Sequence, residues 1–218
     1  MRRIDRTSVA VPACLASAPA AGAYPPKPPG LDQIRSALLY LQGYRCAYCE
    51  RRTGDDGKRD GHIEHFREQA LFPNLALDWG NLFWSCNDSR TCGQHKGYCC
   101  NSHGSTAKFD HANLVNPACD DPENFLLFLS DGRVQPRGGL APAAHQRAVE
   151  TIRVFNLNES AYLERSRQDA IRPYLRAVTS LASHGPAVLR HYVNSELVHT
   201  QTDPFSTAIK HFLTSVAP

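Results

Sequence analysis

Cysteine spacing is the feature that most constrains how this chain can fold. A C-x2-C pair at Cys46 and Cys49 is followed by a second group made of Cys86, Cys92, Cys99 and Cys100. Secreted disulfide scaffolds are usually shorter and more evenly cross-linked than this 218-residue chain. Cysteine pairs on both sides of a histidine-rich segment are typical of a zinc site in a reducing compartment. We expect a structural Zn²⁺ site made of Cys46, Cys49, Cys86 and Cys92, with Cys99 or Cys100 as substitutes in its second half.

The bulk composition is that of an ordinary globular protein. Apolar residues make up 42% of the chain and charged residues 21%, and the formal charge of +3 permits nucleic-acid binding without demanding it. The N-terminus only faintly resembles a signal peptide, because Asp5 and Pro12 interrupt its pattern. No apolar run approaches the ~18 residues of a membrane helix. We therefore expect a cytoplasmic protein with no membrane partner.

The first half of the chain is predicted to hold one clear helix and a loop-rich segment. Residues 31–42 carry a helical apolar stripe, with Asp32 suited to the N-terminal cap and Gly43 to the stop. From 46 to about 108 helical periodicity is weak. There, turn residues over 53–61 predict a tight loop, and the following "HIEHF" predicts a short strand. A bound metal would explain how a segment with so few apolar residues folds.

The second half is predicted to contain a hairpin and then helices. Residues 124–136 read as strand, Asp-Gly turn and strand. The first helix after the hairpin is predicted to end near Asn156. A longer helix follows, in which Pro173 either introduces a kink or starts a new helix. Two further helices are predicted over 187–197 and 206–214. We expect three segments, an N-terminal arm and helix (1–45), a zinc-stapled core with the hairpin (46–136) and a helical region (137–218). Several arginines should form a solvated or partner-binding helical face, namely Arg147, Arg153, Arg165, Arg167, Arg172 and Arg176.

The stretch "DGHIEHF" gathers three groups able to bind a metal or move a proton. His62, Glu64 and His65 lie within four positions. Strand alternation places His62 and Glu64 on one face and turns His65 to the other. Spacing within this stretch alone does not say which of them performs chemistry.

Four motifs in order resemble the HNH nuclease family. They are the C-x2-C pair, Glu64-His65, "NLFWSC" (81–86) and "TCGQHKG" (91–97). More closely, "CAYCE", "HIEHF", "NPACDDPENF" and "TIRVFNLN" resemble PtuB, the HNH proteins of Septu and retron-linked antiphage systems. The resemblance implies an α+β fold with a treble-clef-like, zinc-stapled ββα-metal core, and a metal-dependent endonuclease. It also implies nucleic acid as substrate, a PtuA-like ABC-type ATPase as partner, and in some systems a retron reverse transcriptase with its msDNA.

Phosphodiester hydrolysis needs a base, a cation and hydrogen-bond donors that hold the nucleic-acid backbone. The resemblance to HNH proteins suggests which residues supply each of these. His65 is expected to be the general base, and Asn81 to orient the segment around it through side-chain hydrogen bonds. Glu64 and His95 are expected to hold catalytic Mg²⁺ or Mn²⁺. The phosphate contacts are assigned to Lys96 and Arg67, and His62 is expected to play at most a supporting part.

One departure from the family pattern affects the final ligand. In many relatives a His or Asn directly follows the second knuckle cysteine, whereas here Gly93 and Gln94 separate Cys92 from His95. Gln94 is the alternative ligand. The competing functional hypothesis is a non-catalytic zinc-bound module that binds nucleic acid or protein. DNA is the favoured substrate, while tRNA and other RNA, the sequence specificity and the activation trigger stay open.

Overall fold

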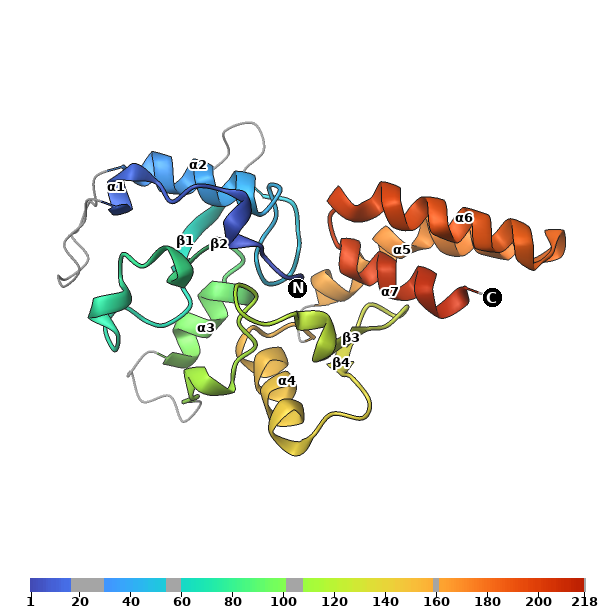
Figure 1. The fold of residues 1–218 in the computed structure, drawn as a ribbon. Helices are drawn as coiled ribbons and strands as arrows, with labels where there is room; N and C mark the ends of the chain where they lie inside the picture. The colour runs from blue at the N-terminus through green and yellow to red at the C-terminus, as the bar shows by residue number, and fades with distance from the viewer. Residues whose placement is uncertain (17–29, 54–59, 101–107, 159–160, 218) are drawn as a thin grey trace.

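The computed structural model describes residues 1–16, 30–53, 60–100, 108–158 and 161–217, with Tyr98 and Cys100 described by their backbone only. Helices and small sheets alternate along the chain, which confirms the α+β class (Figure 1). The strands are β1 (Gly61–His65), β2 (Leu82–Cys86), β3 (Leu126–Phe128) and β4 (Val134–Pro136). The helices are α1 (Ala13–Ala16), α2 (Leu31–Leu41), α3 (Cys92–Cys100), α4 (Pro142–Val154), α5 (Ala161–Leu181), α6 (Pro186–His199) and α7 (Ser206–Val216). Most of the loop predicted over 53–61 lies outside the described residues.

The antiparallel pair β1–β2 forms the centre of the N-terminal half. Gly61 pairs with Cys86 and His65 with Leu82, so the end of β1 meets the start of β2. Every residue of β2 is buried, because α2 and α3 both contact this strand. The short strand predicted at "HIEHF" is therefore confirmed, and its partner is the "LFWSC" segment.

Helix α2 forms where its apolar stripe predicts. Its buried residues are Ile34, Leu38, Leu39 and Leu41. Asp32 lies in the first turn rather than at the cap, since Gly30, with φ at 78°, occupies the N-cap position. The predicted cap was wrong by two residues, whereas Gly43, with φ at 60°, follows the helix end as expected.

The second hairpin, β3–β4, confirms the predicted strand, turn and strand. Leu126 pairs with Pro136 and Phe128 with Val134. Gly132 turns the chain with φ at 83°, a conformation that favours glycine. Its backbone also lies against Glu164 of α5, because a Cβ at this position would meet the Glu164 carbonyl oxygen at 2.2 Å.

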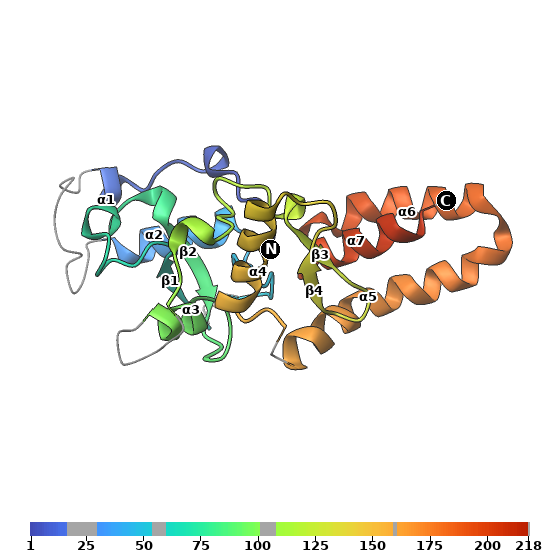
Figure 2. The same cartoon turned by 90° about the horizontal axis from the view of Figure 1, so that it is seen from below.

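Four helices complete the chain. α5 runs continuously through Pro173, so this proline neither ends the helix nor starts a new one. α5 and α6 form a long antiparallel pair that extends away from the strands, with α7 packed against both (Figure 2). In the part of the chain that the structure describes, no helix combines the length and apolar character that crossing a bilayer requires.

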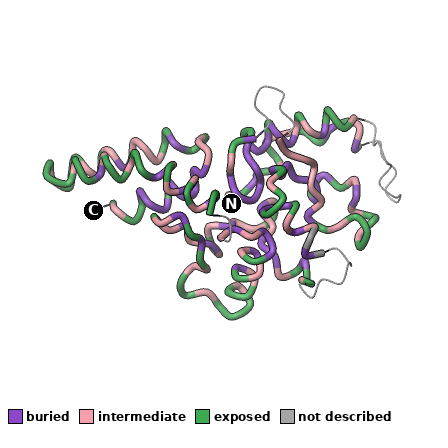
Figure 3. Tube along the Cα trace, turned by 180° about the vertical axis from the view of Figure 1, so that it is seen from behind, coloured by how far each residue is buried: buried purple, intermediate pink, exposed green. Residues whose placement is uncertain are grey.

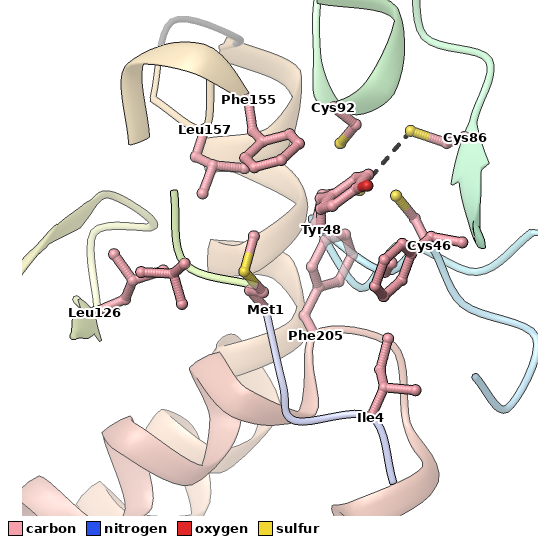
Figure 4. Packing of buried hydrophobic residues seen from close by; sticks show 14 of the residues in the cluster. Met1, Ile4, Cys46, Tyr48, Cys86, Cys92, Leu126, Phe155, Leu157 and Phe205 are labelled. Atoms are coloured by element: carbon pink, nitrogen blue, oxygen red, sulfur yellow. Dashed lines mark hydrogen bonds between the residues drawn. The ribbon is translucent and has the colours of Figure 1, made fainter. Parts of the chain in front are cut away.

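A single hydrophobic cluster includes residues from all three predicted segments. Figure 3 shows buried stretches of the backbone running from the β1–β2 region into the bases of the C-terminal helices. Near the cysteines, Tyr48 stacks on Phe155 with ring centroids 4.0 Å apart. Figure 4 shows Met1, Leu157 and Phe205 close by. The cysteine loop is thus packed against residues that come from α4 and from beyond it.

Candidate metal centre and candidate active site

Four cysteines from three parts of the chain converge in the core. Cys46 and Cys49 belong to the turn after α2, Cys86 ends β2 and Cys92 begins α3. Their sulfur atoms all lie within 4.8 Å of one another, and all four residues are buried (Figure 4). These are the four residues that the sequence favoured for zinc.

Backbone hydrogen bonds hold the cysteine-bearing segments in place. The amide of Cys46 donates to the carbonyl of Arg51 at 2.9 Å, and the amide of Glu50 donates to the carbonyl of Cys46 at 3.1 Å, which closes the turn around Cys49. Cys92 has φ at 56°, in the left-handed region, and its amide donates to the carbonyl of Phe155 at 2.9 Å. The cysteine at the start of α3 is therefore held by the end of α4.

The cysteine cluster fits a tetrahedral zinc ion. Zinc–thiolate bonds of about 2.3 Å place sulfurs about 3.8 Å apart in a tetrahedron, and the sulfurs of Cys49 and Cys86 are 3.9 Å apart. Burial raises the pKa of the Cys46 thiol, but hydrogen bonds from the other three cysteines outweigh burial and lower it well below its ordinary value. Neighbouring thiols and burial raise the pKa values of Cys49 and Cys92. The donor set and the spacing thus suit a closed structural zinc site.

Cys99 does not join the four. Its sulfur lies 3.7 Å from Nδ1 of His95, on α3. The side chain of Cys100 lies outside the described residues, so its alternative role is not addressed by the structure. The first-choice set is the one whose sulfurs lie together.

Glu64 is held between two basic side chains. Its Oε1 lies 2.6 Å from Nζ of Lys96, and its Oε2 lies 3.2 Å from Nε2 of His62. Burial lowers the pKa of His62, but its hydrogen bond to Glu64 and the charge of Glu64 raise it, and the net pKa lies above its ordinary value. His62 and Glu64 therefore share one face of β1, as strand alternation predicts.

Lys96 is an internal cation in this arrangement. Its side chain is 1% exposed. Besides Glu64, its ammonium donates to the carbonyl oxygen of His65 at 2.9 Å. A phosphate contact of Lys96 was expected and stays a prediction; within the chain, its ammonium lies against the end of β1. Arg67 is exposed, with its guanidinium carbon 5.3 Å from the centroid of the Phe72 ring.

Helical periodicity decides which residues of α3 meet Glu64. Gly93 and Lys96 are three residues apart and share a face. A Cβ on Gly93 would lie 2.7 Å from Oε2 of Glu64. His95 lies on another face, where its Nδ1 is 2.9 Å from the carbonyl oxygen of Val154, and Gln94 is exposed. The position that directly follows Cys92 is thus the one over Glu64, and a glycine occupies it.

His65 lies at the strand end with a defined tautomer. Its Nε2 is 2.9 Å from the carbonyl oxygen of Ala76. Since a carbonyl only accepts, Nε2 carries the proton of the neutral ring and Nδ1 is the basic nitrogen. Burial lowers the pKa of His65 below its ordinary value. The ring is therefore neutral at pH 7, which is the form a general base requires.

Asn81 fixes the backbone that follows His65. Its Oδ1 accepts from the amide of Arg67 at 2.7 Å. Its Nδ2 donates to the carbonyls of Arg67 and Leu75, each at 3.0 Å. Both functional ends of this buried amide are used, so Asn81 links the end of β1 to the loop before β2.

Sequence reasoning missed two residues near these centres. Ser85, which is fully buried, accepts from the amide of Gly93 at 3.0 Å and lies 4.0 Å from the Cys46 sulfur. Its place before Cys86 in a buried strand was the available signal. Arg167 was expected on a solvated face, and this was wrong, because its side chain is fully buried. The available signal was its position on the apolar stripe of α5, four residues from both Leu163 and Ile171.

Comparisons with known proteins identify relatives that carry the names of Septu and retron systems. The Septu protein PtuB of Bacillus thuringiensis is 33% identical over 97 residues, which cover 44% of this chain and 33% of that protein. The retron Vc95 putative HNH endonuclease of Vibrio cholerae serotype O1 biovar El Tor is 26% identical over 156 residues, covering 69% of this chain and 70% of that protein. The Septu protein PtuB of Bacillus mycoides (strain KBAB4) is 23% identical over 187 residues, covering 76% and 61%.

No family model matches the chain. The match to the first of these relatives spans only about a third of that protein's length. Identity is modest throughout. The resemblance inferred from the motifs is nevertheless confirmed by these relatives.

Proposed function

From its similarity to PtuB-like HNH proteins, we propose that this chain is an endonuclease that hydrolyses phosphodiester bonds of nucleic acid, with DNA as the favoured substrate. The observation that carries the proposal is the arrangement at the end of β1. There, the buried ammonium of Lys96 contacts both the carboxylate of Glu64 and the backbone carbonyl of His65, whose imidazole is neutral. The order of β1, β2 and α3 along the chain is that of a ββα-metal unit.

Each side chain has a distinct part in this proposal. Nδ1 of His65 takes a proton from the attacking water, a step worth about 10²–10⁴-fold in rate for a positioned base. Asn81 is a positioning residue, because it holds the backbone directly after His65. Arg67, which is exposed, contacts the phosphate backbone of the substrate.

The divalent cation that the family implies, Mg²⁺ or Mn²⁺, is proposed to be held by Glu64 and His95. Both carboxylate oxygens of Glu64 lie against nitrogen atoms of Lys96 and His62, so a cation bound there would compete with these contacts. Nδ1 of His95 lies 2.9 Å from the carbonyl oxygen of Val154, which only accepts, so Nδ1 carries the proton and Nε2 is the nitrogen that could bind a metal.

Zinc fits its proposed ligands and has a structural part. The cysteines join the turn after α2, the end of β2 and the start of α3. Bound zinc supplies folding free energy by cross-linking segments that have little apolar surface of their own. In this way it fixes α3, and with it Lys96, against β1.

The relatives also suggest partners and a setting. Two of them carry the name of the Septu system and one the name of a retron. We propose that the chain acts in antiviral defence in the cytoplasm, beside a PtuA-like ABC-type ATPase. A retron reverse transcriptase and its msDNA are a further proposed association.

The second candidate function is a zinc-bound module that binds nucleic acid or protein without cleaving it. One observation favours it, namely that Gly93 occupies the position over Glu64 where many HNH proteins have a ligand. Such a module needs the cysteine cluster but has no need of a basic imidazole at His65.

A cleavage assay separates the two functions. Purified chain, with and without its neighbouring ATPase, is incubated with plasmid DNA and with RNA in Mg²⁺ or Mn²⁺. We expect cleavage by the wild type and by His145→Ala, a control on the exposed face of α4, and loss of cleavage in His65→Ala. If wild type and His65→Ala behave alike under every condition, the nuclease proposal is lost. Binding without cleavage in both would support the module.

A further inference from the structure

Arg167 is a buried cation for which the described hydrogen bonds account only in part. It lies on α5 with 0% of its surface exposed. Its Nη1 donates to the carbonyls of Gly132 at 2.8 Å and Leu157 at 2.9 Å. Within the described residues, Nε and Nη2 have no hydrogen-bond partner. A buried guanidinium without a counter-charge costs several kcal/mol, so a charge of opposite sign is expected nearby.

The cysteines are the candidates for that charge. Burial lowers the pKa of Arg167, and the groups that act against this are Cys49 first, Cys92 second, and then Glu50 and Glu164. Backbone contacts also connect Arg167 with the segment that holds Cys92. Leu157, whose carbonyl Arg167 binds, follows Phe155, whose carbonyl binds the amide of Cys92.

The carboxylate of Glu50 already has partners of its own. Oε2 of Glu50 accepts from the amide of Thr207 at 3.0 Å and from the hydroxyl of Ser206 at 3.1 Å. Oε1 lies 2.6 Å from the N-terminal ammonium of Met1. Glu164 lies on the same helix as Arg167 and is half-buried. No ion pair joins either carboxylate to Arg167 among the described residues.

A zinc ion bound by four thiolates supplies the missing charge. Zinc binding deprotonates all four cysteines, and one Zn²⁺ with four thiolates leaves a centre with two net negative charges. Such a dianion in a protein core also needs compensation. We propose that Arg167 is the internal counter-charge of the four-cysteine zinc centre, and that α5 stabilises bound zinc through it. This rests on zinc binding by the four cysteines and not on nuclease activity.

Arg51 is a second cation, in the cysteine turn itself. Its guanidinium carbon lies 5.6 Å from the centroid of the Tyr162 ring on α5. Arg51 is only half-buried, so water screens its charge, whereas Arg167 is shielded from solvent.

Zinc affinity in three variants tests the proposal. Arg167→Gln removes the charge but keeps an amide donor for the carbonyls, and Arg167→Lys keeps the charge. Arg172→Gln is the matched control, because Arg172 lies on the same helix with 55% of its side chain exposed. Zinc affinity is measured by competition with a chromogenic chelator, and folding by circular dichroism during refolding at increasing zinc concentration.

We expect zinc affinity to fall by about 10–100-fold in Arg167→Gln, the range seen when outer-shell partners of a metal are removed. Arg167→Lys should lie closer to the wild type, and Arg172→Gln should match it. If a variant folds only at higher zinc concentration, the zinc concentration at which half of it is folded measures the same loss of affinity. Unchanged affinity in Arg167→Gln would overturn the proposal. So would a protein that stays unfolded at saturating zinc in both Arg167 variants, because that result assigns Arg167 to packing.

Discussion

Lys96 and Glu64 form a buried ion pair that joins α3 to β1, with Nζ 2.6 Å from Oε1. Lys96 is 1% exposed and Glu64 12%. Removing one partner of such a pair leaves the other charge buried and unpaired, which costs about 3–5 kcal/mol. We expect Lys96→Met to lower the free energy of unfolding by an amount in this range and to abolish cleavage. Lys108→Met, on an exposed side chain, is the control.

The double variant Lys96→Met/Glu64→Gln shows whether the pair acts as a unit. Because it leaves no uncompensated charge, it should be more stable than Lys96→Met alone, as measured by urea unfolding. Additive losses in the two single variants and the double variant would mean that the pair contributes no coupling. In that case Lys96 would stabilise α3 through its bond to the His65 carbonyl alone.

Two glycines of α3 give a matched test of the space over Glu64. A Cβ at Gly93 would lie 2.7 Å from Oε2 of Glu64 and 2.9 Å from Oγ of Ser85, whereas a Cβ at Gly97 meets nothing within 4 Å. Gly93→Ala should displace Glu64 and destabilise the protein by about 1–3 kcal/mol. Gly97→Ala should be neutral or stabilise by about 0.5–1 kcal/mol, since alanine favours the helix. Equal thermal midpoints for the two variants would contradict the close packing at Gly93.

Local patterns predicted the elements better than they predicted the catalytic geometry. The stripe of α2, the strand at His62–His65 and the Asp-Gly hairpin follow from periods and turn residues that lie within one segment. The side chains of α3 do not, because "CGQHKGYCC" has no clear apolar face and its register depends on where the helix starts. Once Cys92 begins the helix, Lys96 contacts Glu64, and Nδ1 of His95 contacts the carbonyl of Val154. That outcome depends on contacts between segments distant in sequence.

Arg167 illustrates the same limit in the C-terminal half. In the sequence it is one arginine of several in a polar helix, although its spacing from Leu163 and Ile171 places it on the apolar stripe. α5 packs against the β3–β4 turn, where the Gly132 carbonyl accepts from Arg167. Only the glycine at position 132 permits that approach of the backbone to α5. The stripe indicates burial, but no pattern within α5 encodes which carbonyl Arg167 binds.

Zinc binding by the cysteine cluster is predicted to depend on Cys46. Cys46→Ser removes one thiolate from a buried set of four, so we expect the zinc-to-protein ratio to fall well below one per chain. The thermal midpoint should fall with it, because metal binding and folding are coupled. Cys119→Ser is the control, since Cys119 is an exposed free cysteine. A full zinc complement in Cys46→Ser, measured by atomic emission after gel filtration, would remove the assignment.

The contact between Glu123 and His211 predicts how stability changes in acid. The amide of Phe128 donates to Nδ1 of His211, so Nε2 carries the proton and donates to Glu123 at 3.3 Å. This hydrogen bond, with that of Lys210, lowers the pKa of Glu123 from 4.5 to about 2. A depressed carboxyl pKa stabilises the fold above pH 4.5, and the contribution is lost as pH falls toward 2.

We expect Glu123→Gln to be less stable than wild type at pH 7 by about 1–2 kcal/mol, a value that is reduced because Glu123 is partly exposed. The difference in stability should disappear in acid. Urea unfolding of both proteins from pH 7 toward pH 2 measures this difference in stability. Loss of zinc in acid affects both proteins alike, so it cancels in the difference. A gap that stays constant or widens as pH falls would show that Glu123 is not held ionised by this contact.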